Sequence, residues 1–172
     1  LAQHPQHLPS LDQLGRLCWS LGRKDDALAA FARLAEADAR NPEAHRQLAR
    51  AQAAAGHPDL AVRSMEHALS VAVDAPLLSD FAWLLATNPD PSVRDGRRAL
   101  DLALRAVAGA PTGPREVILL AAACAEAGDF ERGVREIDQA LARLPAEVAP
   151  ALGALKEKLG RHEAIRAEAT FP

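Results

Sequence analysis

The chain has 172 residues, of which 49% are hydrophobic and 25% are charged, and its formal net charge is -3. This hydrophobic content excludes a chain that is disordered throughout, and the weak negative charge disfavours nucleic acid as a partner. No apolar run approaches the ~20 residues that cross a bilayer, so we expect no membrane contact by this segment.

Apolar residues at helical spacing predict five pairs of helices. In the first pair, Leu11, Leu14 and Leu17 belong to one apolar stripe, Gly22 ends it, and Phe31 belongs to the second stripe. The predicted helices are 10–21 with 24–39, 42–55 with 58–74, 76–87 with 95–109, 114–127 with 130–143, and a shorter pair near 147–159 and 161–169.

Residues that favour helix ends support these bounds. Ser10 with Gln13 predicts a capping box, and Asn41-Pro42 predicts an N-cap followed by proline at the first helical position. Helix C-termini are predicted at three glycines: Gly22, Gly56 and Gly128.

The helix pairs recur with a period of 34 residues. Ala27 and Ala61 are 34 residues apart, Ala61 and Ala99 are 38 apart, and Ala99 and Gly133 are again 34 apart. The period therefore survives one four-residue insertion. We expect 1–7 to be the tail of a preceding repeat, 8–41, 42–75, 76–113 (insertion near 87–95) and 114–147 to be repeats, and 148–172 to be C-terminal capping helices.

Helix pairs of this length with small residues in fixed columns resemble the tetratricopeptide repeat family, as a bacterial-type array with one lengthened repeat. The residues that carry the resemblance are Leu14, Gly15, Gly22, Ala27 and Phe31; Leu48, Ala49, Gly56, Ala61 and Ala68; Ala82, Ala99, Ala106 and Pro111; and Leu120, Ala121, Gly128, Ala140 and Pro145. The resemblance implies an all-α, right-handed superhelical solenoid of antiparallel helix hairpins, with the first helix of each pair on the concave surface.

Charged residues on those first helices are the candidate peptide-binding groove. The candidates are Asp12, Arg16, Arg46, Arg50, Asp80 and Arg115. The groove is expected to be locally basic around Arg16, Arg46 and Arg50, which favours a partner with an acidic segment or a carboxylate, bound through bidentate hydrogen bonds. The alternative is a solvated helix face on which Asp12 pairs with Arg16 and Arg46. The carboxylate clamp known in this family is not reproduced, since Asp12, Arg16 and Gln47 stand at its places.

The insertion is a second candidate site. Trp83, Asp90 and Arg94 are its candidate binding residues, and Asp90 or Asp95 is expected to cap the next helix. The functional interpretation is a binding loop on one edge of the solenoid, and the alternative is a longer turn pinned by Trp83.

The sequence indicates no catalytic, cofactor-binding or metal site. Cys18 and Cys124 fall within apolar helical patterns, which favours buried thiols. His45, His57 and His67 fall in different helical registers and form no metal-binding spacing. We therefore expect no enzyme activity.

These patterns predict a protein–protein interaction scaffold that binds a partner protein or peptide, with self-association as a further expectation. The alternative is a structural or spacer arm of a larger bacterial membrane-bound or enzymatic protein. Composition favours a bacterial source, and the cytoplasm and the periplasm both remain open.

Overall fold

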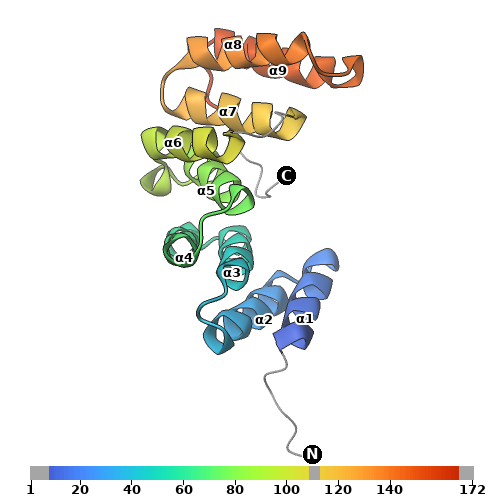
Figure 1. Cartoon of the computed structure of the whole chain (residues 1–172), viewed down its shortest axis with the longest axis vertical. Coiled ribbons are helices and arrows are strands. Elements are labelled where there is room, and N and C mark those ends of the chain that lie inside the picture. The colour runs from blue at the N-terminus through green and yellow to red at the C-terminus, as the bar shows by residue number, and fades with distance from the viewer. Residues whose placement is uncertain (1–7, 109–112, 167–172) are drawn as a thin grey trace, which may run out of the picture. The chain divides into compact units, whose positions relative to one another are not determined.

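The computed structural model describes residues 8–108 and 113–166. Across these residues the chain has nine α-helices and two 3₁₀ turns and forms no strand (Figure 1). The helices divide into two compact units, Leu1–Val73 and Asp74–Pro172. The predicted all-α helical repeat fold is confirmed.

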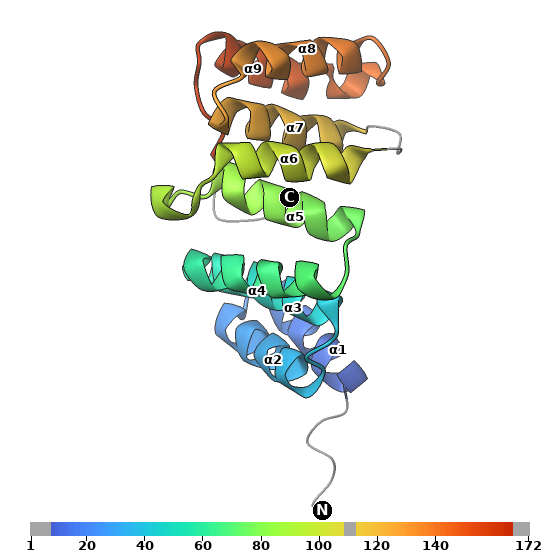
Figure 2. The same ribbon diagram turned by 60° about the vertical axis from the view of Figure 1, so that its left-hand side comes forward.

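The first unit contains two consecutive helix hairpins. Its helices are α1 (Leu8–Ser20), α2 (Lys24–Ala37), α3 (Pro42–Ala54) and α4 (Pro58–Val71). Each helix packs against the next one along the chain, as the blue and green ribbons of Figure 2 show. Phe31 and Leu34 of α2 are buried in one core cluster with Ala44 and Ala51 of α3. The small alanines let α3 approach α2 closely.

The second unit contains five helices and both short turns. They are α5 (Ala75–Thr87), η1 (Pro91–Val93), α6 (Gly96–Val107), α7 (Pro114–Glu126), α8 (Phe130–Leu141), η2 (Ala146–Val148) and α9 (Ala149–Gly160). Here α7 packs against both α5 and α6, and α8 packs against both α7 and α9. No helix in the described residues is long and apolar enough to span a membrane.

Small residues at one equivalent position of the four predicted repeats are all buried where helices pack closely. Ala27, Ala61 and Ala99 are each 0% exposed, and Gly133 is buried. At Gly133 an added Cβ would lie 2.9 Å from Leu159 Cδ1 of α9. Close helix contact therefore explains why glycine stands where the other repeats have alanine.

Most of the predicted helix ends are found, with one correction. The Asn41 side chain caps α3 by accepting a hydrogen bond from the Ala44 N–H at 3.1 Å. Gly22, Gly56 and Gly128 each have a positive φ after a helix, where glycine is favoured. The capping box at Ser10 is wrong, because α1 is already helical from Leu8 and Ser10 lies inside it.

The last predicted helix is also wrong over its described part. The chain turns at Arg161 and His162, and residues 163–166 form neither helix nor strand. His162 has a φ of 56°, which stops the helix, and Ile165 alone cannot form an apolar stripe. The remainder of that prediction, 167–169, and the predicted repeat tail at 1–7 lie outside the described residues.

Candidate functional site

Arginines from two successive repeats meet at one carboxylate in the first unit. Arg16 of α1 donates to the Asp12 carboxylate at 2.8 Å and reaches Glu43 Oε1 at 3.4 Å. Arg46 of α3 forms a 2.6 Å ion pair with the same Glu43. We name Asp12, Arg16, Glu43 and Arg46 the charged row. The structure thus brings together three of the six predicted groove residues.

Glu43 is the member that the sequence analysis missed. It accepts hydrogen bonds from both Arg46 and Gln47, so it partly neutralises a face that was expected to be locally basic. The Arg46 side chain is only 16% exposed, whereas Arg16 is 54% exposed. The hydrogen bond with Asp12 raises the pKa of Arg16 and keeps it charged. The i, i+3 spacing of Glu43 and Arg46 was the signal available in the sequence.

The other predicted groove residues lie elsewhere or deeper. Arg50 is half-buried on α3. Asp80 of α5 is 1% exposed and lies 3.4 Å from Arg115 of α7, so its carboxylate faces the interior of the second unit rather than solvent. Of this pair, only Arg115 is accessible, with 57% of its side chain exposed.

The insertion is folded back onto the second unit. Arg94 donates to the carbonyls of Asn88 and Pro89 and forms a 2.9 Å bond with Glu126 at the end of α7. Asp90 caps η1 by accepting from the Ser92 N–H, and this hydrogen bond lowers the pKa of the Asp90 carboxyl. Arg94 therefore serves the internal structure of the insertion.

The remaining insertion residues have internal positions too. Trp83 is half-buried in α5, and Asp95 caps α6 by accepting from the Arg98 N–H at 3.0 Å. The exposed Asp90 is the insertion candidate that solvent reaches most directly.

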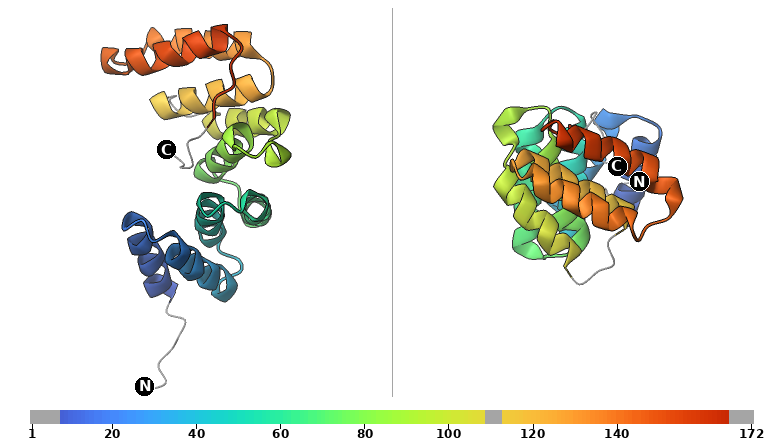
Figure 3. Two further views of the ribbon diagram at one scale, coloured as in Figure 1. Left: turned by 180° about the vertical axis from the view of Figure 1, so that it is seen from behind. Right: turned by 90° about the horizontal axis from the view of Figure 1, so that it is seen from above.

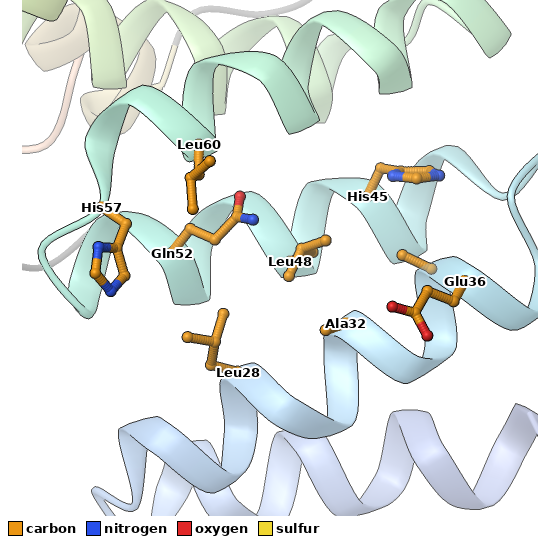
Figure 4. A pocket seen from close by; sticks show the side chains of 9 residues that line it. Leu28, Ala32, Glu36, His45, Leu48, Gln52, His57 and Leu60 are labelled. Carbon is orange, nitrogen blue, oxygen red and sulfur yellow. The ribbon is translucent and has the colours of Figure 1, made fainter.

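An apolar groove opens on the other side of α3. Figure 4 shows Leu28 of α2, Leu48 of α3 and Leu60 of α4 converging on it. Its volume is about 440 Å³, within the range of roughly 300–1,000 Å³ for ligand pockets. We name it the apolar groove; it is lined by Leu28, Ala32, Ala35, Glu36, His45, Leu48, Gln52, His57 and Leu60.

His45 and His67 meet at the rim of this groove, although their sequence registers did not predict it. Their ring centroids are 4.1 Å apart, and both Nε2 atoms contact the Ala39 carbonyl, at 3.1 Å and 3.0 Å. Burial lowers the pKa of His45, and the neighbouring His67 lowers it further. In the described residues no three His, Cys, Asp or Glu side chains gather as metal ligands would.

Both cysteines are buried, as their apolar surroundings predicted. Burial raises the pKa of the Cys124 thiol to about 11, so the thiolate needed for nucleophilic chemistry is suppressed near neutral pH.

Comparisons with known proteins support the repeat assignment. The family model described as tetratricopeptide repeat matches residues 8–51. A comparison with curated protein sequences found no match. Among solved structures, PilF of Pseudomonas aeruginosa superposes with a TM-score of 0.72 at 18% identity, covering 88% of this chain and 67% of that one.

Two structures of MamA are also similar. MamA from Desulfovibrio magneticus RS-1 gives a TM-score of 0.70 at 19% identity and covers 90% of each chain. A further MamA structure gives 0.66 at 15% identity, covering 90% of this chain and 87% of that one. At these identities the likeness shows the fold alone. Residues 8–51 thus match the tetratricopeptide repeat family, and over most of its length the chain shares the helical-repeat fold of these structures.

Proposed function

We propose that the chain is a non-catalytic scaffold whose charged row binds an acidic segment or a terminal carboxylate of a partner protein. The observation that supports this is the meeting of Arg16 and Arg46 at Glu43, from two successive repeats. Helical repeats present side chains from successive units along one continuous face, which suits an extended peptide.

The geometry supports Arg16 as the main contact. Its guanidinium is 54% exposed and lies 3.4 Å from Glu43, so a partner carboxylate can replace the longer of its two ion pairs. Glu43 itself remains 43% exposed, which also favours a partner with a basic residue beside the acidic one. A segment of mixed charge therefore fits the row better than a purely acidic one.

The test uses defined peptides. A fluorescein-labelled ten-residue peptide of alternating Glu and Ala, a Glu/Lys/Ala version and a Lys/Ala version are titrated in fluorescence anisotropy. We expect the two Glu-containing peptides to bind, the mixed peptide more tightly, and the Arg16→Ala/Arg46→Ala variant to weaken both by at least about tenfold, since even one charged hydrogen bond contributes roughly 1.5–3 kcal/mol. Arg63→Ala, at an exposed site on α4, is the matched control. Equal affinities of the wild type and the double variant would refute the proposal.

The apolar groove is a second candidate surface of the same scaffold. The equivalent positions two repeats further on are closed: His45, Leu48 and Gln52 are half-buried, whereas their counterparts Val117, Leu120 and Cys124 are 1%, 3% and 0% exposed. Ala32 of the groove corresponds to the larger Leu104. The helix junction that is open to solvent in the first unit is therefore closed by larger or more buried side chains at the equivalent positions of the second unit.

We propose an amphipathic partner helix for the apolar groove, with a bulky apolar residue next to Lys or Arg. Leu28, Leu48 and Leu60 would receive the apolar side chain. Glu36 is exposed at the same groove and has no ion-pair partner within the described part of the chain, so it complements a basic residue.

Filling the groove tests this second surface. Ala32→Leu should abolish binding of a labelled Leu/Lys/Ala model helix and leave the protein folded, while Ala154→Leu on an exposed site of α9 should not affect binding. If Ala32→Leu binds the helix as the wild type does, the groove is not the site.

A further inference from the structure

The chain returns across its second unit after α9, where the sequence predicted a capping helix. Figure 3 shows this dark red segment leaving α9 and passing α7. The turn is held by the His162 ring, which stacks on Phe130 of α8 with centroids 4.7 Å apart. Residues 163–166 then continue without helix or strand. The segment therefore crosses the end of α7 as a bound peptide would.

Two side chains anchor the segment. Ile165 is 7% exposed, although both of its neighbours, Ala164 and Arg166, are exposed. Arg166 Nη1 lies 2.7 Å from Glu126 Oε2 and 3.4 Å from the Ala86 carbonyl oxygen. The receiving groups thus come from the C-terminal turns of α7 and α5.

This receiving surface has the chemistry of an arginine site. Glu126 is only 15% exposed, and its other oxygen, Oε1, accepts from Arg94 of the insertion at 2.9 Å. Ala86 belongs to the last turn of α5, where carbonyl groups lack helical partners and carry partial negative charge. A mostly buried carboxylate and a helix-end carbonyl therefore both face the Arg166 guanidinium.

The hold on the segment is slight. Within the described part of the chain, the main-chain N–H groups of Ala164, Ile165 and Arg166 donate no hydrogen bond. One buried side chain and one half-exposed ion pair must offset the entropy lost by ordering an extended segment. A segment held in this way exchanges readily with a competitor.

We propose that the C-terminal ends of α5 and α7 form a docking site for an extended partner segment in which an apolar residue is followed directly by arginine. The chain's own Ile165-Arg166 pair occupies this site and reports the chemistry that it accepts. Partner binding requires displacement of residues 163–166, so the chain's own segment lowers the apparent affinity. The site is separate from the charged row and the apolar groove, and it does not depend on either.

The test uses the six-residue peptide of residues 161–166, Arg-His-Glu-Ala-Ile-Arg, labelled at its N-terminus. Fluorescence anisotropy compares the wild type with the full-length variant Ile165→Asp/Arg166→Glu, whose own segment no longer competes. We expect the variant to bind the peptide about tenfold more tightly, because the tethered segment acts at high effective concentration. Ala164→Asp, at the exposed position between the anchors, should leave the affinity as in the wild type.

The peptide itself supplies the specificity controls. Peptides in which the isoleucine is replaced by Asp, or the final arginine by Glu, should not bind the released variant. Binding of all three peptides alike, equal binding to wild type and variant, or no binding to either would each overturn the proposal.

A second measurement needs only the wild-type chain. In methyl NMR, saturating peptide should move the Ile165 methyl signal towards the position of a solvent-exposed isoleucine, because the peptide displaces this buried side chain. An unchanged Ile165 signal would contradict the proposal even if the released variant failed to fold.

Discussion

Gly96 is the residue at which a single methyl group should most disturb the second unit. An added Cβ would lie 2.3 Å from the Glu126 carbonyl oxygen and 2.5 Å from the Ala127 nitrogen. Both are main-chain atoms at the end of α7, so no side-chain rotation can relieve the contact. Since ordinary contact begins at 3.4 Å, the start of α6 must move away by about 1 Å.

We expect Gly96→Ala to lower the free energy of unfolding of this unit by about 2 kcal/mol, despite a gain of up to about 1 kcal/mol in helix propensity. For a unit of this size the midpoint of thermal unfolding should fall by about 8 °C or more. Differential scanning calorimetry measures this midpoint.

The matched control is Gly153→Ala in α9, where an added Cβ meets nothing within 4 Å. That variant should gain about 0.5–1 kcal/mol, because alanine favours the helix. If Gly96→Ala also raised the midpoint or left it unchanged, the close approach of α6 and α7 would not exist in solution.

Three further predictions concern single side chains. Asn41→Ala should cost about 1 kcal/mol of unfolding free energy in urea titrations, because the N-cap of α3 is lost. Because folding lowers the pKa of His45, the unfolded chain takes up the proton first, so stability should fall between about pH 7 and pH 5 and fall less in His45→Gln than in His57→Gln. Cys124 should resist Ellman's reagent at about pH 8 in the native state and react in urea.

Helical periodicity was enough to predict the hairpins, because each helix needs one apolar stripe and that stripe is visible in the sequence. Asn41, Gly22 and Gly56 act locally, so their roles also followed from their neighbours. The prediction failed near Arg161, where Ile165 is buried and Arg166 forms an ion pair with Glu126, far away in sequence. Local pattern cannot show such contacts.

The candidate site was less predictable than the fold. Spacing alone placed Arg16 and Arg46 on one face, but it did not show that Glu43 would join them. The same spacing extended the row to Asp80, which is in fact buried. Register predicts which face a residue occupies, whereas burial of that face depends on what packs over it.

The columns that form the charged row change character along the chain. The column of Arg16 continues through Arg50 to Leu84 and Ala122, which are 3% and 0% exposed. This column is therefore charged in the first unit and apolar and buried in the second, so the two units should recognise different partner chemistry. The charged row and the Glu126 site share no residue. Substitutions at Arg16 and Arg166 should therefore have additive effects on the affinity for one partner that carries the segments recognised by both surfaces. A coupling free energy well above about 0.5 kcal/mol between them would show that both surfaces serve one ligand.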